Sequence, residues 1–363
     1  MKRKLIWLFI IFLFLLLALF FIFPEFLGSG ISYKKSDELV KREKSLASVI
    51  PPLDIVAYDK KLNELANNPP APQPALPLPW PVKTVYPNAG AILPFKRIVA
   101  YYGNLYSPKM GVLGQYPEEE MLAKLDTEVK KWETADPNTP VLPALHYIAV
   151  VAQQKPGGDG KYRLRMPDSE IDKVLAIAAK IPARNVSGIA DAGGNALVFL
   201  DIQVGFSSLQ AEMPLLEKYF KLPNVHLGID PEFSMKNGIR PGKIVGTFDA
   251  DDINFTADYL ARIVRENNLN PKILVVHRYT QKMVTNYKMI KSLPEVQIVM
   301  HMDGWGGMAK KINTYQQFIY KEPVQFTGFK LFYKNDVFEP NTVLMTPAEL
   351  LKLSPQPVYI QYQ

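Results

Sequence analysis

Two kinds of hydrophobic pattern alternate along residues 95–363 of the chain. Short apolar runs of strand length are separated by stretches in which apolar residues recur at helical spacing. The short runs predict eight strands, at Arg97–Tyr102, Val141–Ile148, Leu197–Gln203, Val225–Asp230, Ile273–His277, Val296–His301, Phe326–Phe332 and Val358–Tyr362. The intervening stretches predict helices that start near Pro117 and Asp168 and then cover Pro214–Phe220, Asp251–Glu266, Gln281–Ser292, Asn313–Tyr320 and Pro347–Leu353.

This alternation is typical of parallel β-α-β units. Eight strands over about 270 residues predict an α/β fold, a (β/α)8 barrel of the TIM type, which typically takes ~250 residues. A doubly wound open sheet is the alternative, but Tyr102-Gly103-Asn104-Leu105-Tyr106 after the first strand is not a glycine-rich phosphate loop. The chain ends with the eighth strand, and the residues before the first strand could cover the gap left by a missing eighth helix.

The beginning of the chain has a different pattern. Leu5 to Phe23 are 19 consecutive apolar residues, preceded by the basic cluster Lys2-Arg3-Lys4. A helix of that length rises about 28 Å, close to the ~30 Å hydrocarbon thickness of a bilayer. Residues 1–30 are therefore predicted to be an uncleaved single-pass membrane anchor, with the domain that follows outside the cytoplasm. A cleaved signal peptide is the alternative, although its apolar core is normally only ~7–15 residues.

Two segments connect this anchor to the barrel domain, residues 95–363. Residues 31–68 carry helical signals that are interrupted at Pro51-Pro52 and predict a helical juxtamembrane segment. Residues 69–94 contain a dense part of the chain's 31 prolines. Such a composition favours extended polyproline geometry, so this stretch is predicted to be a semi-rigid linker.

Composition and charge exclude several classes of function. The absence of cysteine excludes a disulfide framework, an iron–sulfur site and a thiol nucleophile. The net charge is +7, of which residues 1–30 carry +2 and residues 31–68 carry +1. The remaining +4 is not gathered into a run of basic residues, so we expect no nucleic-acid partner.

Polar side chains collect where the predicted strands end. The carboxyl ends of barrel strands form the catalytic face in barrel enzymes, so these side chains are expected to meet at one rim. The residues concerned are His146, Asp201, Gln203, Asp230, Glu232, His277, His301, Asp303 and Lys330.

The sharpest local feature is Gly228-Ile229-Asp230-Pro231-Glu232-Phe233. Two carboxylates two residues apart on a strand lie on the same side, and close like charges raise the pKa of one of them. Glycoside cleavage needs such a pair, a protonated acid and an ionised base or nucleophile. The sequence thus predicts Glu232 as the general acid, with Asp201, Asp230 or Asp303 as the base or nucleophile.

The Asp-x-Glu of residues 230–232 resembles the end of the strand-four motif of family 18 chitinases, in which the Glu is the acid. By this resemblance Glu232 is the proton donor and Asp230 its partner. The Asp-x-x-Asp that precedes the motif in that family is missing here, because Asn224, Leu227 and Gly228 occupy the region. The acetamido-assisted mechanism of the family is therefore not implied.

Several blocks also resemble a set of uncharacterised bacterial surface proteins, which implies an envelope location and no particular activity. These blocks are Tyr101-Tyr102-Gly103-Asn104, Gly111-Val112-Leu113-Gly114, Asp201-Ile202-Gln203, Asp230-Pro231-Glu232, His301-Met302-Asp303-Gly304 and Gly328-Phe329-Lys330-Leu331-Phe332-Tyr333. Together with the acid pair they predict a membrane-anchored, glycoside-hydrolase-like barrel acting on an envelope or environmental glycan.

Aromatic and basic side chains support a sugar ligand, because aromatic faces pack on the apolar faces of sugar rings. The expected substrate-binding residues are Tyr102, His146, Gln203, His277, His301, Trp305 and Lys330. A metal-dependent amide or ester hydrolase that uses the histidines is one alternative, but the first strand lacks a His-x-His pair and we predict no metal and no cofactor. A non-catalytic glycan-binding surface protein is the other alternative.

Overall fold

The computed structural model describes residues 51–68, 79–182 and 196–363, all within one unit that spans Ile50–Gln363. The predicted membrane anchor in residues 1–30, the first part of the juxtamembrane segment and residues 69–78 of the linker lie outside these ranges. Among the described helices, none combines the length and the apolar character that a membrane span requires.

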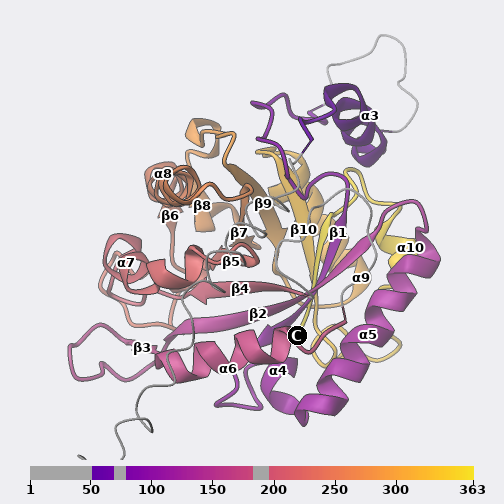
Figure 1. Cartoon of the computed structure of the whole chain (residues 1–363). Coiled ribbons are helices and arrows are strands. Elements are labelled where there is room, and N and C mark those ends of the chain that lie inside the picture. Colours follow the sequence, from indigo (N-terminus) through magenta and orange to yellow (C-terminus); the bar gives the residue numbers. More distant parts are fainter. Residues whose placement is uncertain (1–50, 69–78, 183–195) are drawn as a thin grey trace, which may run out of the picture. The chain divides into compact units, whose positions relative to one another are not determined.

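Eight parallel strands close into a barrel, which confirms the predicted fold (Figure 1). They follow one another around the ring in chain order, and the first strand pairs with both the second and the last. All eight predicted strands are present, with ends shifted by a few residues. They are β1 (Arg97–Gly103), β2 (Val141–Ala152), β4 (Leu197–Ile202), β5 (Val225–Ile229), β7 (Lys272–Arg278), β9 (Val296–Met302), β10 (Phe326–Leu331) and β11 (Tyr359–Tyr362).

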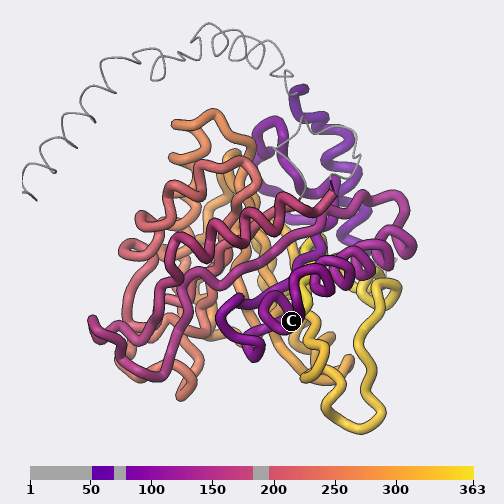
Figure 2. The backbone as a smooth tube through the Cα atoms, turned by 60° about the horizontal axis from the view of Figure 1, so that its bottom comes forward, coloured from indigo at the N-terminus to yellow at the C-terminus, as the bar shows by residue number. Residues whose placement is uncertain are grey.

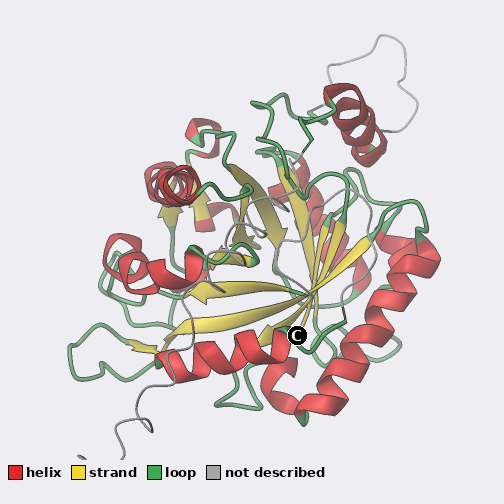
Figure 3. Ribbon diagram, in the orientation of Figure 1, coloured by secondary structure: helices red, strands yellow, loops and turns green. Residues whose placement is uncertain are grey.

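Helices cover the outside of the barrel (Figure 3). The helix α8 illustrates why: Asp249 and Asp252 form a capping box at its start, and its apolar residues recur on one buried face. The helices are α4 (Val112–Gln115), α5 (Glu118–Ala135), α6 (Asp168–Ala178), α7 (Leu209–Phe220), α8 (Ala250–Asn267), α9 (Met308–Tyr315), continued by the π-turn η5 (Gln316–Tyr320), and α10 (Pro347–Leu350). Outside the ring, β3 (Arg163–Arg165) pairs antiparallel with the end of β2, and β6 (Phe248–Asp249) pairs with β8 (Val284–Thr285).

The helix predicted over Gln281–Ser292 is wrong. That segment forms the 3-10 turn η3 (Gln281–Met283), the short strand β8 and the 3-10 turn η4 (Tyr287–Met289). Asn286 has a left-handed φ of +56°, and its side chain donates to Asp249 at the start of α8. Tertiary hydrogen bonds thus replace the helical ladder here. The helix predicted from Pro214 begins earlier, at Leu209, because Ser208 caps it.

The two ends of the barrel are closed differently. The helix α3 (Ile55–Ala66) packs Tyr58 and Leu65 against apolar residues at the starts of the strands, so it covers the amino-terminal end. The gap between β11 and β1 is instead covered by α5 and α10, and Trp132 of α5 donates to the Tyr362 hydroxyl at 3.0 Å. Of the residues before the first strand that the structure describes, those of α3 plug the amino-terminal end of the barrel instead of filling this gap.

The barrel interior changes from apolar to polar along the strands. Alternate residues of each strand point inward, and near the amino-terminal end these are apolar: Ile98, Ala100, Ala144, Leu197, Phe199, Ile273, Val275 and Val299. One layer further along, the inward residues are charged or polar, and they lead to the loops at the carboxyl ends. The fold thus places the polar residues over an apolar base.

A long loop connects β10 to α10 (Figure 2). Asp336 of this loop ties it to a second loop at the carboxyl ends of the strands. Its carboxylate accepts from the Gly306 N–H at 2.9 Å, the Phe332 N–H at 2.9 Å and the Lys311 ammonium at 2.7 Å. Both Asp336 and Lys311 are buried. The loop that carries Trp305 is therefore fixed to the loop after β10.

The plug at the amino-terminal end gives a stability prediction. The buried amide of Gln297 accepts from the N–H groups of Ile92 and Leu93 at 3.1 Å each, and donates to the Leu93 carbonyl at 2.6 Å. Gln297→Leu leaves these backbone groups unpaired, so we expect the free energy of unfolding in urea to fall by about 2–5 kcal/mol. Gln317→Leu on the exposed face serves as the control, with a change within about 0.5 kcal/mol. Equal effects of the two variants would contradict this role of Gln297.

Candidate functional site

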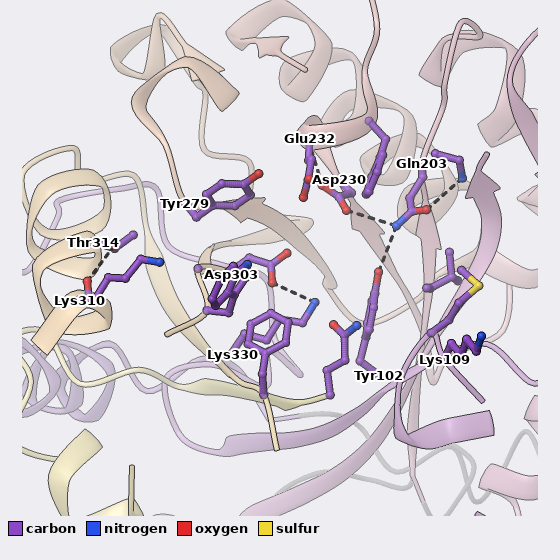
Figure 4. Close-up of a pocket in the computed structure, with 18 residues that line it drawn as sticks. Tyr102, Lys109, Gln203, Asp230, Glu232, Tyr279, Asp303, Lys310, Thr314 and Lys330 are labelled. Carbon is purple, nitrogen blue, oxygen red and sulfur yellow. Dashed lines mark hydrogen bonds and ion pairs between the residues drawn. The ribbon is translucent and has the colours of Figure 1, made fainter. Parts of the chain in front are cut away.

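A cleft of about 600 Å³ lies at the carboxyl ends of the barrel strands (Figure 4). Its polar lining comes from different strands: Tyr102 from β1, Gln203 after β4, Asp230 and Glu232 after β5, Tyr279 after β7, Asp303 after β9, and Lys330 from β10. Aromatic side chains complete the wall, namely Phe233, Trp305 and Phe332. This is the rim where the sequence predicted that polar residues would meet.

The predicted site residues divide into two layers. Seven line the cleft: Tyr102, Gln203, Asp230, Glu232, Asp303, Trp305 and Lys330. The other four are fully buried in the barrel and do not line it: His146, Asp201, His277 and His301. These four side chains are therefore not placed to contact a ligand in the cleft.

The acid pair has a different local geometry from the one expected on a continuous strand. The strand β5 ends at Ile229, and residues 231–233 form the 3-10 turn η2. Asp230 caps this turn, since its Oδ1 accepts from the Glu232 N–H at 3.0 Å and its Oδ2 accepts from Gln203 Nε2 at 3.3 Å. Asp230 thus holds the backbone of Glu232 in place, and the Glu232 side chain lines the cleft (Figure 4).

Burial favours the neutral form of both acids. Burial raises the pKa of Asp230 well above its ordinary value, and the nearby carboxylates of Glu232 and Asp201 raise it further, against the opposing charge of His277. Burial also raises the pKa of Glu232, with a second contribution from the charge of Asp303.

The pKa of Asp303 shifts in the opposite direction, toward the ionised form. Its Oδ1 lies 2.9 Å from the Lys330 ammonium, and its Oδ2 lies 2.9 Å from His277 Nδ1. Burial alone would raise the pKa of Asp303, but the charges of Lys330 and His277 outweigh it and lower the pKa. Lys330 also lies over the Tyr102 ring, 3.8 Å from its centroid, a cation–π contact that fixes the ammonium.

The cleft therefore contains two carboxyl groups biased toward the protonated form, Asp230 and Glu232, and one held as a carboxylate, Asp303. Titratable pairs whose surroundings push their pKa values apart are the arrangement that acid–base catalysis uses. This is the strongest chemical feature of the cleft.

Beneath the cleft floor, three side chains converge on one point. His146 Nε2 and His277 Nε2 lie 3.4 Å and 3.5 Å from Asp201 Oδ1, and none of these three atoms has a hydrogen-bond partner. The other Asp201 oxygen accepts from the Tyr102 hydroxyl at 3.0 Å. The group is one that could hold a metal ion.

The pKa values of His146 and His277 shift in opposite directions. Burial lowers the pKa of His146 to about 4, which Asp201 only partly offsets. Burial also opposes the charge on His277, but Asp201 and Asp303 outweigh it and raise its pKa to about 10. Burial lowers the pKa of His301 well below its ordinary value, with the charge of His277 adding to the effect.

Two residues of this centre were not predicted from the sequence, Tyr359 and Gln361 on the last strand. The Tyr359 hydroxyl lies 2.5 Å from His146 Nδ1, and Gln361 Nε2 lies 3.0 Å from the same atom. Gln361 is a polar residue on alternate positions with Tyr359 in a strand that is buried throughout. That alternation was the available signal, because polar residues inside a buried strand need a partner.

A comparison of the sequence with models of known protein families found no match, and a comparison with curated proteins found none either. The similarities drawn from the sequence therefore stay predictions. The function has to be inferred from the chemistry of the cleft.

The close packing around the buried histidines gives a prediction. A Cβ at Gly228 on β5 would overlap His146 Nε2 and would lie 2.6 Å from Asp201 Oδ1. We expect Gly228→Ala to lower the free energy of unfolding by about 1–3 kcal/mol in urea titrations, because the buried groups must shift. At Gly158, where a Cβ meets nothing within 4 Å, the same substitution should change stability by no more than about 0.5 kcal/mol. A tolerated Gly228→Ala would show that this space is adaptable.

Proposed function

We propose that the cleft hydrolyses a glycosidic bond, with Glu232 as the general acid and Asp303 as the base or nucleophile. The observation that carries this proposal is the opposite charge bias of these two groups in one open cleft. Glycoside cleavage requires a proton for the leaving oxygen and a carboxylate that either attacks the reacting carbon or deprotonates the water that does so.

Asp303 is favoured over the other two candidates for the second carboxylate. Asp201 is completely buried below the floor of the cleft. Asp230 has both oxygens engaged, and its pKa is raised, so it serves to position Glu232. Asp303 alone among the three both lines the cleft and is held ionised.

The walls of the cleft support a sugar as the ligand. Trp305 is 50% exposed although it is a large aromatic residue, and Phe233, Tyr279 and Phe332 also line the cleft. Lys310 lies over the Trp305 ring, 4.4 Å from its centroid, which steadies the exposed indole. Aromatic faces next to convergent polar groups match the mixed apolar and hydroxylated surface of a sugar ring.

The position of the three side chains that could bind a metal ion argues against a metal-dependent amide or ester hydrolase. His146, Asp201 and His277 could hold an ion, but none of them lines the cleft. An ion there would not present an open coordination position to a substrate bound beside Trp305. The proposed envelope location, and with it a glycan of the cell envelope or surroundings, rests on the 19 apolar residues and the basic cluster at the start of the sequence.

The central test replaces the acid. Glu232→Gln keeps the shape of the side chain and removes its proton, so we expect turnover to fall by about 10²–10⁴-fold. The measurement is the release of new reducing ends from a panel of cell-wall and soluble glycans, with circular dichroism to check folding. Glu119→Gln, on the exposed face of α5, is the matched control and should keep full activity. Full activity of Glu232→Gln would remove Glu232 from the mechanism, and binding without cleavage by the unaltered chain would favour a glycan-binding module.

The pH dependence gives a second test. Burial and Asp303 raise the pKa of Glu232, whereas a hydrogen bond with Tyr279 lowers it by favouring the carboxylate. Activity needs protonated Glu232, so it should fall as the pH rises through the pKa of this residue. Tyr279→Phe removes the hydrogen bond, raises the pKa and should shift the basic limb of the kcat/KM profile to higher pH. A shift to lower pH would contradict the assignment.

A further inference from the structure

We propose that His146, Asp201 and His277 bind a divalent metal ion, with zinc the best match, in the barrel interior directly below the cleft floor. The site lies one layer beneath the groups assigned to glycoside cleavage, so its occupancy does not depend on the reaction in the cleft. Its role is to hold in position Tyr102 and Asp303, which line the cleft and contact the ligands Asp201 and His277.

The spacing of the three ligand atoms fits one ion. Two ligands bound to zinc at about 2.0–2.1 Å in tetrahedral geometry lie about 3.3–3.4 Å from each other. His146 Nε2 and His277 Nε2 are 3.4 Å and 3.5 Å from Asp201 Oδ1, which is close to that spacing and long for a hydrogen bond. All three atoms lie within 4.8 Å of one another.

The same atoms lack any other partner. His146 Nε2, Asp201 Oδ1 and His277 Nε2 are buried and make no hydrogen bond. Leaving one buried polar atom unpaired costs about 1–3 kcal/mol, so three that face one point favour an ion bound between them. Gly228 keeps the space beside them open, because a Cβ there would overlap His146 Nε2.

The opposite edges of both imidazoles are held as metal-bound histidines require. Ligating histidines use their second ring nitrogen to bond a carboxylate or another acceptor, which fixes the ring and the tautomer. His277 Nδ1 contacts Asp303 Oδ2 at 2.9 Å, and His146 Nδ1 contacts the Tyr359 hydroxyl at 2.5 Å. Gln361 lies next to the same nitrogen, and its Oε1 has no partner, so the reverse orientation of its amide accepts the Nδ1 proton as well.

An ion at this point would be connected to the cleft through two short links. The Tyr102 hydroxyl donates to Asp201 Oδ2, and Asp303 bonds His277, while both Tyr102 and Asp303 line the cleft. Two histidines and one carboxylate leave a fourth position for a water. The competing occupant is a proton on His277, which would also balance the two carboxylates and would leave His146 Nε2 facing Asp201 Oδ1 at 3.4 Å.

The test is zinc binding by the full-length chain in mild detergent, after metal has been removed with a chelator. Calorimetric titration with zinc chloride should show one ion per chain with a dissociation constant below about 1 μM. Zinc should raise the thermal unfolding midpoint, since it binds only the folded chain. Cobalt in its place should give the visible absorption of a tetrahedral site.

Two histidine variants locate the ion. His146→Asn keeps a polar atom where Nδ1 stood and removes the Nε2 ligand, so zinc affinity should fall by about 100-fold or more. His226→Asn changes a buried histidine of the same barrel whose Nδ1 accepts from the Ile273 N–H, and it should leave affinity within about 3-fold. If the unaltered chain binds no zinc, the occupant is the proton on His277 and the proposal is wrong. Unchanged affinity of His146→Asn would also overturn it.

Discussion

The carboxyl-terminal half of this barrel depends on the ion pairs of Asp303, a carboxylate that is almost completely buried. A buried charge costs several kcal/mol unless oppositely charged and hydrogen-bonding groups surround it. Lys330 and His277 supply these partners at 2.9 Å each, and Lys330 is in turn held over the Tyr102 ring. Burial raises the pKa of the neighbouring Glu232, and the charge of Asp303 adds to this effect.

A continuous chain of hydrogen bonds connects Asp201 in the barrel interior to Glu232 in the cleft. The Tyr102 hydroxyl donates to Asp201, and Gln203 Nε2 reaches both that hydroxyl and Asp230. Asp230 then accepts from the backbone N–H of Glu232. All links but the last join residues on, or directly after, different strands, so the orientation of Glu232 depends on the closure of the barrel and not on its own loop alone. A rigid support of this kind is what a catalytic acid needs.

The two ends of the barrel have different roles: the amino-terminal end stabilises the fold, and the carboxyl end carries the cleft. At the amino-terminal end, Gln297 bonds the backbone of Leu93 and α3 covers the apolar interior. At the carboxyl end, Asp336 ties the Trp305 loop to the loop after β10 through the Gly306 N–H and Lys311. In barrels of this type the loops at the carboxyl ends carry function and the opposite end carries stability. The fixed Trp305 loop therefore presents its exposed indole to the cleft without a loose hinge.

The sequence alone determined the barrel, because eight buried parallel strands leave eight apolar runs at regular spacing, and it also placed Glu232, Asp303 and Lys330 at one rim. It did not determine the segment after Gln281, where hydrogen bonds to α8 replace a helix. Nor did it separate the cleft-lining residues from the buried layer that contains His146 and His277. Those outcomes depend on strand register, twist and closure, which decide whether an inward side chain meets water, a charge or another strand. Local pattern encodes the direction of a side chain, and only the closed ring of strands fixes its depth.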